Sequence, residues 1–222
     1  MLDIAISVQN CEDPINMFET KIITTHTDDT INTIDEITRG REKKPEWFNF
    51  RRGRITASLF PSVANFGFSD NPDNYTVKQI MNENKDLRTP AIQFGVDEPV
   101  GRCLYYEKYC ETQKGANIKQ TGLFIDAEYP ILGASPDGIV SCHCCGKGLL
   151  EIKCSAKYKD KSPIEVCSEN SYHLYLDENN KVSLKYDSPW YIQIQGQMGV
   201  SKMKWCDCFL HNKRYFCLKN IF

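Results

Sequence analysis

The sequence lacks long apolar runs, internal repeats, low-complexity segments and a strong net charge, and these absences exclude several classes of protein. No apolar stretch approaches the roughly 18 residues that a membrane-spanning helix requires, so we predict a protein without membrane contacts. The N-terminus has no basic region and no small-residue cleavage site, which predicts an intracellular protein, nuclear or cytoplasmic, and not a secreted one. The net charge of −2 excludes a nucleic-acid binder that is basic throughout.

Histidine is scarce, whereas cysteine is abundant. The four histidines show no spacing to a partner that would indicate a general base. The eleven cysteines are an odd number, spread unevenly along a chain too long to depend on disulfide bonds. Reduced thiols in an intracellular compartment are therefore expected.

The chain is long and apolar enough to bury a sizeable core. Its 222 residues are 41% hydrophobic, which favours a single domain, placed at residues 39–222 after an N-terminal arm or helix at residues 1–38. Hydrophobic periodicity predicts helices over 71–87, 90–113 and 188–203, strands within 116–141 and 148–155, a loop-rich stretch over 155–187 and a hairpin around 211–214. This order of elements indicates a mixed α/β (α+β) fold.

One short segment is basic although the whole chain is nearly neutral. RGREKKPEWFNFRRGR, residues 39–54, holds seven of the 27 Lys and Arg residues against two Glu. The ITAS segment that follows places Ser58 where it can cap a helix whose first turn exposes N–H groups. A local basic patch of this kind suits an enzyme that binds phosphate at one place. The alternative is a solvated loop, which is what charge runs usually form.

The segments SPDG and EIK, with thirteen residues between the Asp of the first and the Glu of the second, combine two carboxylates with a lysine. Side chains alternate along a strand, so Glu151 and Lys153 point to the same face. Asp137 lies in the preceding turn, where a hairpin can bring it next to Glu151. Two converging carboxylates, with the Ile152 carbonyl as a further oxygen ligand, suit Mg²⁺ or Mn²⁺, and the lysine can orient a water against a phosphodiester. The alternative is a surface hairpin with a weak Glu–Lys ion pair.

Four motifs, taken in order, resemble those of one nuclease family. The spacing of SPDG and EIK is similar to the signature of the PD-(D/E)XK nuclease superfamily. PEWFNFRRGRITAS, FGVDEPVGRCLYYEKY and WYIQIQGQM resemble the N-terminal motif and two helices of the phage lambda exonuclease and YqaJ viral recombinase family. Each motif is weak alone, but the ordered set spans about residues 45–200 and is highly specific.

The resemblance implies both a fold and an activity. The fold is a restriction-endonuclease-like core, with a mixed central β-sheet flanked by helices. The activity is that of an Mg²⁺- or Mn²⁺-dependent 5′-to-3′ exonuclease on double-stranded DNA ends, used in recombination or in the processing of viral or mobile-element DNA. Implied partners beyond DNA are further copies of the chain, in a ring-shaped homo-oligomer, and a single-strand annealing protein.

The resemblance also assigns roles to residues by their positions in the motifs. Asp137 and Glu151 would ligate metal together with the Ile152 carbonyl. Glu98 would contribute through a second metal or its water shell. Lys153 would assist the attacking water, and Gln193 would orient the lysine or the water. The residues that would bind the 5′-terminal phosphate and the DNA are Arg51, Ser58, Arg52 and Arg54.

The cysteine run CHCC, residues 142–145, raises the question of a second metal. It differs from a simple zinc knuckle and no second Cys-x-x-Cys pair follows, so free thiols at a hairpin are the favoured interpretation. A structural Zn²⁺ would need a larger ligand set, namely Cys142, Cys144, Cys145, Cys206 and Cys208. Two alternative functions stay open on the same fold: an inactive, zinc-organised DNA-binding module, and an endonuclease or single-strand-specific nuclease.

Overall fold

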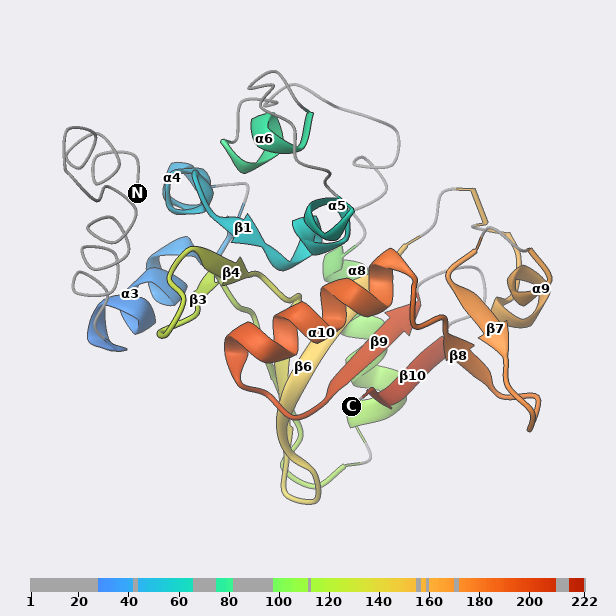
Figure 1. The fold of residues 1–222 in the computed structure, drawn as a ribbon. Helices are drawn as coiled ribbons and strands as arrows, with labels where there is room; N and C mark the ends of the chain where they lie inside the picture. Colours follow the sequence, from blue (N-terminus) through green and yellow to red (C-terminus); the bar gives the residue numbers. More distant parts are fainter. Residues whose placement is uncertain are drawn as a thin grey trace, which may run out of the picture. The chain divides into compact units, whose positions relative to one another are not determined.

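The computed structural model describes residues 28–41, 44–65, 75–81, 98–111, 113–154, 157–158, 160–169, 172–210 and 216–221. These residues form short helices and strands in two compact units (Figure 1). Unit 1 takes its described residues from 1–85, 121–135 and 199–201, and unit 2 takes its described residues from 86–120, 136–198 and 202–222. Each unit has its own sheet and its own buried apolar clusters.

Unit 1 consists of short helices and a three-stranded sheet. The helices are α3 (Asp28–Thr38), α4 (Pro45–Arg51), η2 (Ala57–Leu59), α5 (Phe60–Ala64) and α6 (Tyr75–Ile80). The strands lie in the order β1 (Ile55–Thr56), β4 (Leu132–Ala134) and β3 (Phe124–Ile125), with β1 parallel and β3 antiparallel to β4. Ile34, Leu123 and Ile125 form one of its buried clusters. The boundary predicted at residue 38 falls at the end of α3, inside this unit.

A buried threonine joins α3 to the start of β3. Thr38 Oγ1 donates to the Ile34 carbonyl at 2.5 Å and accepts from the Leu123 N–H at 2.8 Å. The Asp35 carboxylate accepts from the Gly122 N–H at 2.8 Å. A Cβ at Gly122 would lie 2.2 Å from the Asp35 carbonyl oxygen, so glycine is needed for this close approach of helix and strand.

Unit 2 contains a mixed five-stranded sheet. Its strands lie in the order β10 (Phe216–Ile221), β9 (Cys206–Leu210), β6 (Gly146–Lys153), β5 (Gly138–Cys142) and β2 (Asn117–Lys119). The β6–β9 pair is parallel and the other pairs are antiparallel. Parallel neighbours need a long connection. The connection from β6 to β9 contains α9 (Pro163–Cys167), β7 (Leu174–Leu176), β8 (Val182–Leu184) and α10 (Pro189–Ser201).

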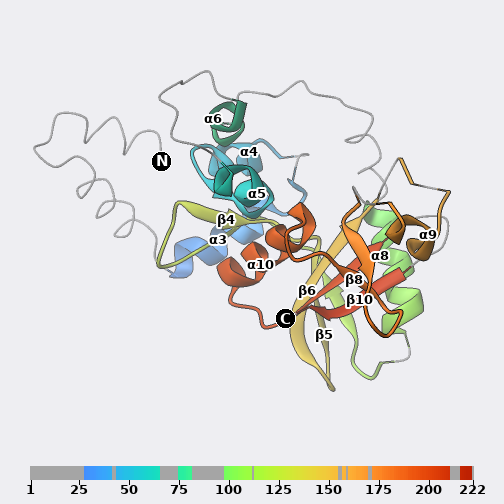
Figure 2. The same cartoon turned by 45° about the vertical axis from the view of Figure 1, so that its right-hand side comes forward.

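Helices cover both faces of this sheet (Figures 1 and 2). The helix α8 (Glu98–Tyr105) continues as the π-helix η4 (Tyr106–Cys110) before β2. On one face of β6, Ile194 of α10 packs in a cluster with Leu149. On the other face, Tyr105 of α8 packs in a cluster with Leu150. The mixed α/β fold predicted from the sequence, with a mixed sheet flanked by helices, is therefore confirmed.

The stretch over 155–187, predicted to be rich in loops, contains a short helix and a short hairpin. α9 begins with a capping box, in which Ser162 Oγ accepts from the Glu165 N–H at 3.4 Å and Glu165 accepts from the Ser162 N–H at 2.5 Å. Strands β7 and β8 have three residues each and pair antiparallel. Elements this short give no periodic hydrophobic signal, which is why the prediction missed them.

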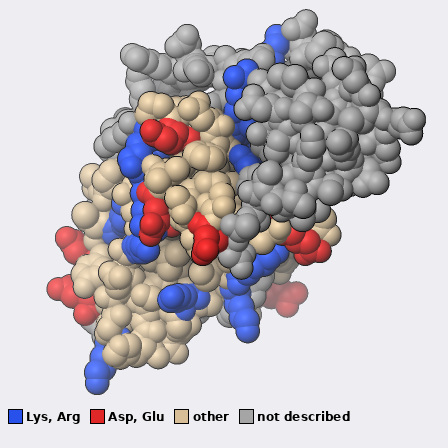
Figure 3. All heavy atoms as spheres, turned by 90° about the vertical axis from the view of Figure 1, so that its left-hand side faces the viewer, with Lys and Arg blue, Asp and Glu red and all other residues tan. Residues whose placement is uncertain are grey.

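Charged groups of both signs share the surface. On the face drawn in Figure 3, Lys and Arg side chains lie interspersed with Asp and Glu side chains, in keeping with the net charge of −2. Binding of a polyanion is therefore expected from local groups of basic residues. Over the described residues, no helix combines the length and the apolar character that a membrane span needs.

Gly148 on β6 lies against the indole of Trp205. A Cβ added at Gly148 would lie 2.1 Å from Cδ2 of that ring, whose Nε1 donates to the Cys145 carbonyl at 3.2 Å. We therefore expect Gly148→Ala to lower the free energy of unfolding by about 1–3 kcal/mol, the usual cost of overpacking, as measured by urea denaturation. Gly199→Ala is the matched control. A Cβ there meets nothing within 4 Å, so this substitution in α10 should leave stability unchanged or raise it by about 1 kcal/mol. Equal stability of the two variants would contradict the packing described.

Candidate active site

The β5–β6 hairpin brings Asp137 to the middle of the sheet. Gly138 pairs with Leu150 across the two strands, so Asp137, one residue earlier, lies opposite the start of EIK. Asp137 Oδ2 accepts a hydrogen bond from the Ile152 N–H at 2.5 Å. The hairpin thus brings the first predicted carboxylate next to the strand that carries the second.

Glu151, Lys153 and Gln193 form a closed triangle of hydrogen bonds. The Lys153 ammonium donates to Glu151 Oε1 at 2.7 Å and to Gln193 Oε1 at 2.8 Å. Gln193 Nε2 donates to the same Glu151 oxygen at 2.7 Å. Glu151 and Lys153 come from one face of β6, and Gln193 comes from α10, which packs on that face. The structure therefore brings together these three predicted residues.

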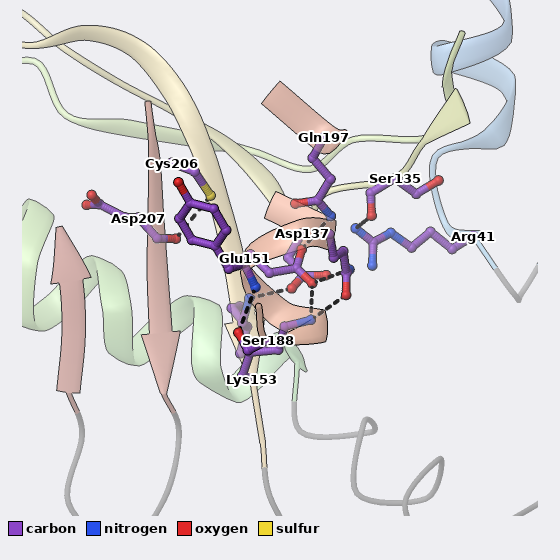
Figure 4. A network of polar contacts seen from close by, with 12 residues as sticks. Arg41, Ser135, Asp137, Glu151, Lys153, Ser188, Gln197, Cys206 and Asp207 are labelled. Atoms are coloured by element: carbon purple, nitrogen blue, oxygen red, sulfur yellow. Dashed lines mark hydrogen bonds and ion pairs between the residues drawn. The ribbon is translucent and has the colours of Figure 1, made fainter. Parts of the chain in front are cut away.

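Gln197 belongs to the same network although it was not predicted from the sequence. It is buried, and its Nε2 donates to Glu151 Oε2 at 2.8 Å (Figure 4). Gln193 and Gln197 are four residues apart, so they lie on one face of α10. This i, i+4 spacing within QIQGQ is the signal that could have identified Gln197.

Burial of this network changes the preferred charge states. The pKa of Glu151 is raised, first because burial disfavours its charged form and next because the Asp137 carboxylate repels it, while Lys153 opposes the shift. Burial would lower the pKa of Lys153, but the charge and the hydrogen bond of Glu151 outweigh burial and raise it. Lys153 is therefore an ammonium at neutral pH, and two buried carboxylates share its positive charge.

The two carboxylates fit a divalent cation. Asp137 and Glu151 are 7% and 4% exposed, and the repulsion between them helps to raise the pKa of Glu151. A cation between them would offset this repulsion, and carboxylate oxygens are the hard ligands that Mg²⁺ and Mn²⁺ prefer. The Ile152 carbonyl as a further ligand stays a prediction. Glu98 is the first residue of α8, and its side chain lies outside the described part of the structure.

An aromatic pair lies beside the lysine of this site. The Trp190 ring centroid is 5.8 Å from the Lys153 ammonium, and the His173 ring packs against Trp190 in a tilted arrangement with ring centroids 4.3 Å apart. Burial lowers the pKa of His173, and the nearby charges of Lys153 and Lys185 lower it further. This side of the lysine is therefore lined by neutral rings, which favour the ammonium through its attraction to the indole.

In unit 1, Arg51 and Ser58 are linked through Thr56. Arg51 Nη2 donates to Thr56 Oγ1 at 3.3 Å, and the hydroxyl oxygens of Thr56 and Ser58 are 3.2 Å apart. The Arg51 guanidinium also lies 4.1 Å from the Trp47 ring centroid. Burial, and then the charge of Arg41, lower the pKa of Arg51 to about 10. Two neighbouring guanidinium groups with hydroxyls beside them are suited to bind an anion.

The other two predicted basic residues have different surroundings. Arg52 is exposed at the C-terminal end of α4. Arg54 is buried, and its guanidinium donates to the carbonyl of Pro130 at 2.9 Å and to the carbonyl of Phe50. Burial lowers the pKa of Arg54 to about 10. These bonds tie α4 to the segment before β4, so Arg54 has a role in the fold, and its contact with DNA stays a prediction.

The cysteine run places three thiols together at the tip of the β5–β6 hairpin. The sulfur atoms of Cys142, Cys144 and Cys145 all lie within 4.8 Å of one another. Cys206 and Cys208 are fully buried on β9 and are not part of this group. The five-cysteine set expected for a structural zinc is therefore not assembled among the described residues, because β9 pairs with β6 further from the tip.

Three solved structures, of two different proteins, share this fold. LHK-Exo, an alkaline exonuclease from Laribacter hongkongensis, is 24% identical over 80% of this chain and 81% of its own, with a TM-score of 0.53. Its complex with dAMP gives 27% identity over 79% and 81%, with a TM-score of 0.56. A SOX–DNA complex is 12% identical over 91% of this chain and 63% of its own, with a TM-score of 0.53. The chain therefore has the fold of the alkaline exonucleases.

The family of the chain follows from a match over most of its length. No curated protein matches the sequence significantly. The family model of the YqaJ-like viral recombinase domain matches residues 46–204, which include Asp137, Glu151, Lys153 and Arg51. The chain therefore belongs to the YqaJ-like viral recombinase domain family, as its ordered motifs predicted.

Proposed function

We propose that this protein is a metal-dependent exonuclease that hydrolyses double-stranded DNA from its ends in the 5′-to-3′ direction, in recombination or in viral or mobile-element DNA processing. Its family supports this proposal, as does its likeness to LHK-Exo, an alkaline exonuclease solved with dAMP. The observation that carries it is the buried network in which Asp137, Glu151 and Lys153 converge. Further copies in a ring and a single-strand annealing protein are proposed partners on the family resemblance alone.

The carboxylates would hold the metal. Asp137 and Glu151 would bind Mg²⁺ or Mn²⁺ with the Ile152 carbonyl, and Glu98 would act through a second metal or its water shell. When bound, such a cation offsets negative charge on the phosphate and makes water easier to deprotonate. The chain itself orients the ligands, because the Ile152 N–H fixes Asp137, and two glutamines on α10 fix Glu151.

Lys153 would hold the attacking water. Among the described residues, its ammonium binds Glu151 and Gln193, and an ammonium has three N–H donors. The third donor is therefore able to bind a water on the side of the carboxylates. Gln193 accepts from Lys153 and donates to Glu151, so it fixes the direction in which the ammonium points.

A basic group in unit 1 would bind the 5′-terminal phosphate through Arg51 and Ser58. Arg41 is a second guanidinium of this group that the sequence did not single out. It is buried, donates to the Ser135 carbonyl at 3.1 Å and helps to lower the pKa of Arg51. A phosphate would offset the repulsion between the two cations and accept charge-assisted hydrogen bonds. Arg52, which is exposed, would contact the DNA backbone.

The proposal is tested by digesting three forms of one duplex with Mg²⁺: linear with 5′-phosphates, linear with 5′-hydroxyls, and a covalently closed circle. We expect the 5′-phosphorylated linear duplex to be degraded fastest, from the 5′ end of each strand, and the circle to stay intact. Cleavage of the circle would instead support the endonuclease alternative. Binding without hydrolysis of any form, with Mg²⁺ or with Mn²⁺, would support an inactive DNA-binding module.

Arg51→Lys separates recognition of the end from the chemistry in the same assay. Hydrogen bonds to charged groups are worth about 1.5–3 kcal/mol, so losing part of the guanidinium fork should reduce the preference for 5′-phosphate over 5′-hydroxyl ends by about tenfold or more. The rate on 5′-hydroxyl ends should change little. Arg52→Lys, at the exposed neighbouring position, is the matched control and should keep the preference. An unchanged preference in Arg51→Lys would remove Arg51 from the phosphate site.

A further inference from the structure

The tip of the β5–β6 hairpin has a C-x-x-C-G sequence with a third cysteine inside it. Cys142 is the last residue of β5, Gly146 is the first of β6, and Cys144 and Cys145 lie in the turn between them. Gly146 has a φ of +72°, in the left-handed region that glycine allows. The Cys145 N–H donates to the Cys142 sulfur at 3.3 Å, a bond that favours the thiolate form. This spacing is one that zinc-binding turns use.

The three sulfur atoms already lie at separations that suit a metal. The sulfurs of Cys142 and Cys144 are 3.1 Å apart, those of Cys144 and Cys145 are 3.3 Å apart, and all three lie within 4.8 Å of one another. Tetrahedral Zn²⁺ with Zn–S bonds of about 2.3 Å needs sulfurs about 3.8 Å apart, so shifts of about 1 Å or less are enough. A disulfide needs two sulfur atoms about 2.05 Å apart, and all three cysteines are free thiols.

Contacts from two sides hold the tip in this conformation. Trp205 Nε1 donates to the Cys145 carbonyl at 3.2 Å. On the other side, the His143 N–H donates to the Lys114 carbonyl at 3.2 Å, and the His143 ring lies so close to Gly115 that a Cβ there would be 2.5 Å from Nε2. The surroundings therefore impose the backbone conformation that gathers the thiols. Such preorganisation lowers the entropic cost of binding a ligand.

We propose that Cys142, Cys144 and Cys145 bind one Zn²⁺ as thiolates, with the fourth position open to water. Thiolates select Zn²⁺ over Mg²⁺, which separates this site from the carboxylates proposed for catalysis. Cys144 and Cys145 are exposed, so the metal reaches the tip directly from solvent. Binding releases the thiol protons to water and changes no oxidation state. Within the described residues, this is the one group of three His, Cys, Asp or Glu side chains with ligand atoms this close together.

The zinc would stabilise the hairpin that carries the catalytic candidates. Strands β5 and β6 pair without interruption from Cys142 and Gly146 at the tip to Gly138 and Leu150 next to the carboxylates. A metal that closes the tip opposes separation of these strands, because its binding free energy adds to that of folding. Its role is therefore structural, and the zinc takes no part in the hydrolysis.

The test uses the intact chain, purified with a phosphine reductant, loaded with one equivalent of Zn²⁺ and dialysed. We expect one zinc per chain by mass spectrometry, a thiolate-to-metal charge-transfer band after Co²⁺ substitution, and a higher unfolding temperature with zinc than after chelation. The double variant Cys144→Ser/Cys145→Ser should lose the bound zinc, the charge-transfer band and the gain in unfolding temperature. Both side chains are exposed, so the variant should still fold. Zinc retained by this variant, or no zinc bound by the wild type, would overturn the proposal.

Two further variants assign the zinc to the tip. Cys103→Ser is the matched control, because it removes another exposed thiol, on α8, and it should keep the full zinc content. Asp137→Asn removes a carboxylate of the candidate active site and should also keep the zinc. Loss of zinc from Asp137→Asn would place the metal at the carboxylates and overturn the proposal. Zinc kept by Asp137→Asn while DNA hydrolysis is lost would show that the two sites are independent.

Discussion

Replacing Asp137 with Asn is expected to lower the rate of DNA hydrolysis by about 10³-fold. Asparagine has nearly the same shape as aspartate. Its oxygen can still accept the hydrogen bond that the Ile152 N–H donates to Asp137 Oδ2, with 2.5 Å between nitrogen and oxygen, so the fold should be kept. What is lost is the negative charge of one of the two proposed metal ligands. Charge stabilisation by a bound cation is worth several kcal/mol, and about 4 kcal/mol corresponds to 10³-fold in rate. The measurement is kcat/KM for nucleotide release from a 5′-phosphorylated linear duplex.

A stability measurement without catalysis distinguishes loss of metal from misfolding in this variant. In the wild type, Mg²⁺ at about 100 times its Kd should raise the free energy of unfolding by about 2.7 kcal/mol. In Asp137→Asn the gain should largely disappear. Without metal, the variant should be at least as stable as the wild type, because repulsion from Asp137 helps to raise the pKa of Glu151.

A matched control tests whether this effect is specific to the site. Asp177 also accepts backbone N–H groups, from Asn179 and Lys181 at 2.9 Å, but it lies in the β7–β8 turn. Asp177→Asn should therefore keep both the hydrolysis and the response to Mg²⁺. Hydrolysis at the wild-type rate in Asp137→Asn would remove this carboxylate from the proposed site.

The core of the candidate site could be predicted because it depends on local periodicity. Glu151 and Lys153 are two residues apart on a strand and therefore share a face, and the hairpin register places Asp137 next to them. Gln193 was assigned by the family resemblance, and the packing of α10 on that face accounts for its contact with the other two residues. Gln197 could have been found in the same way, since four residues separate two side chains on one face of a helix.

Residues whose roles depend on distant neighbours could not be assigned from the sequence. Arg51 and Arg54 are three residues apart with identical side chains, yet the Arg54 guanidinium binds the carbonyl of Pro130, which is 76 residues further along the chain. Nothing in the local sequence distinguishes the arginine that is suited to bind an anion from the one that joins α4 to the segment before β4. Cys206 and Cys208 similarly looked like partners of the hairpin cysteines, but their strand is buried in the sheet.

Lys153→Met is the second substitution with a large expected effect. Methionine keeps an unbranched side chain of similar length but removes the ammonium that binds Glu151 at 2.7 Å and Gln193 at 2.8 Å. We expect kcat/KM to fall by about 10²–10³-fold, the usual effect of removing one preorganised donor. Lys161→Met is the control, because Lys161 forms a comparable ion pair with Glu169 on the surface, and it should keep full activity.

The pKa of Lys153 decides which role this lysine has. Burial would lower that pKa, but Glu151 outweighs burial and raises it from 10.5, so the side chain stays protonated at neutral pH. A protonated lysine cannot accept a proton from water, so it must act through its charge and its N–H donors. Lys153→Arg, which keeps the charge, should therefore retain more activity than Lys153→Met, and the ratio of wild-type to Lys153→Met rates should stay constant between about pH 7 and 9. If Lys153 were a general base, both variants would be equally inactive, and the wild-type advantage would grow as the pH approached the lysine pKa.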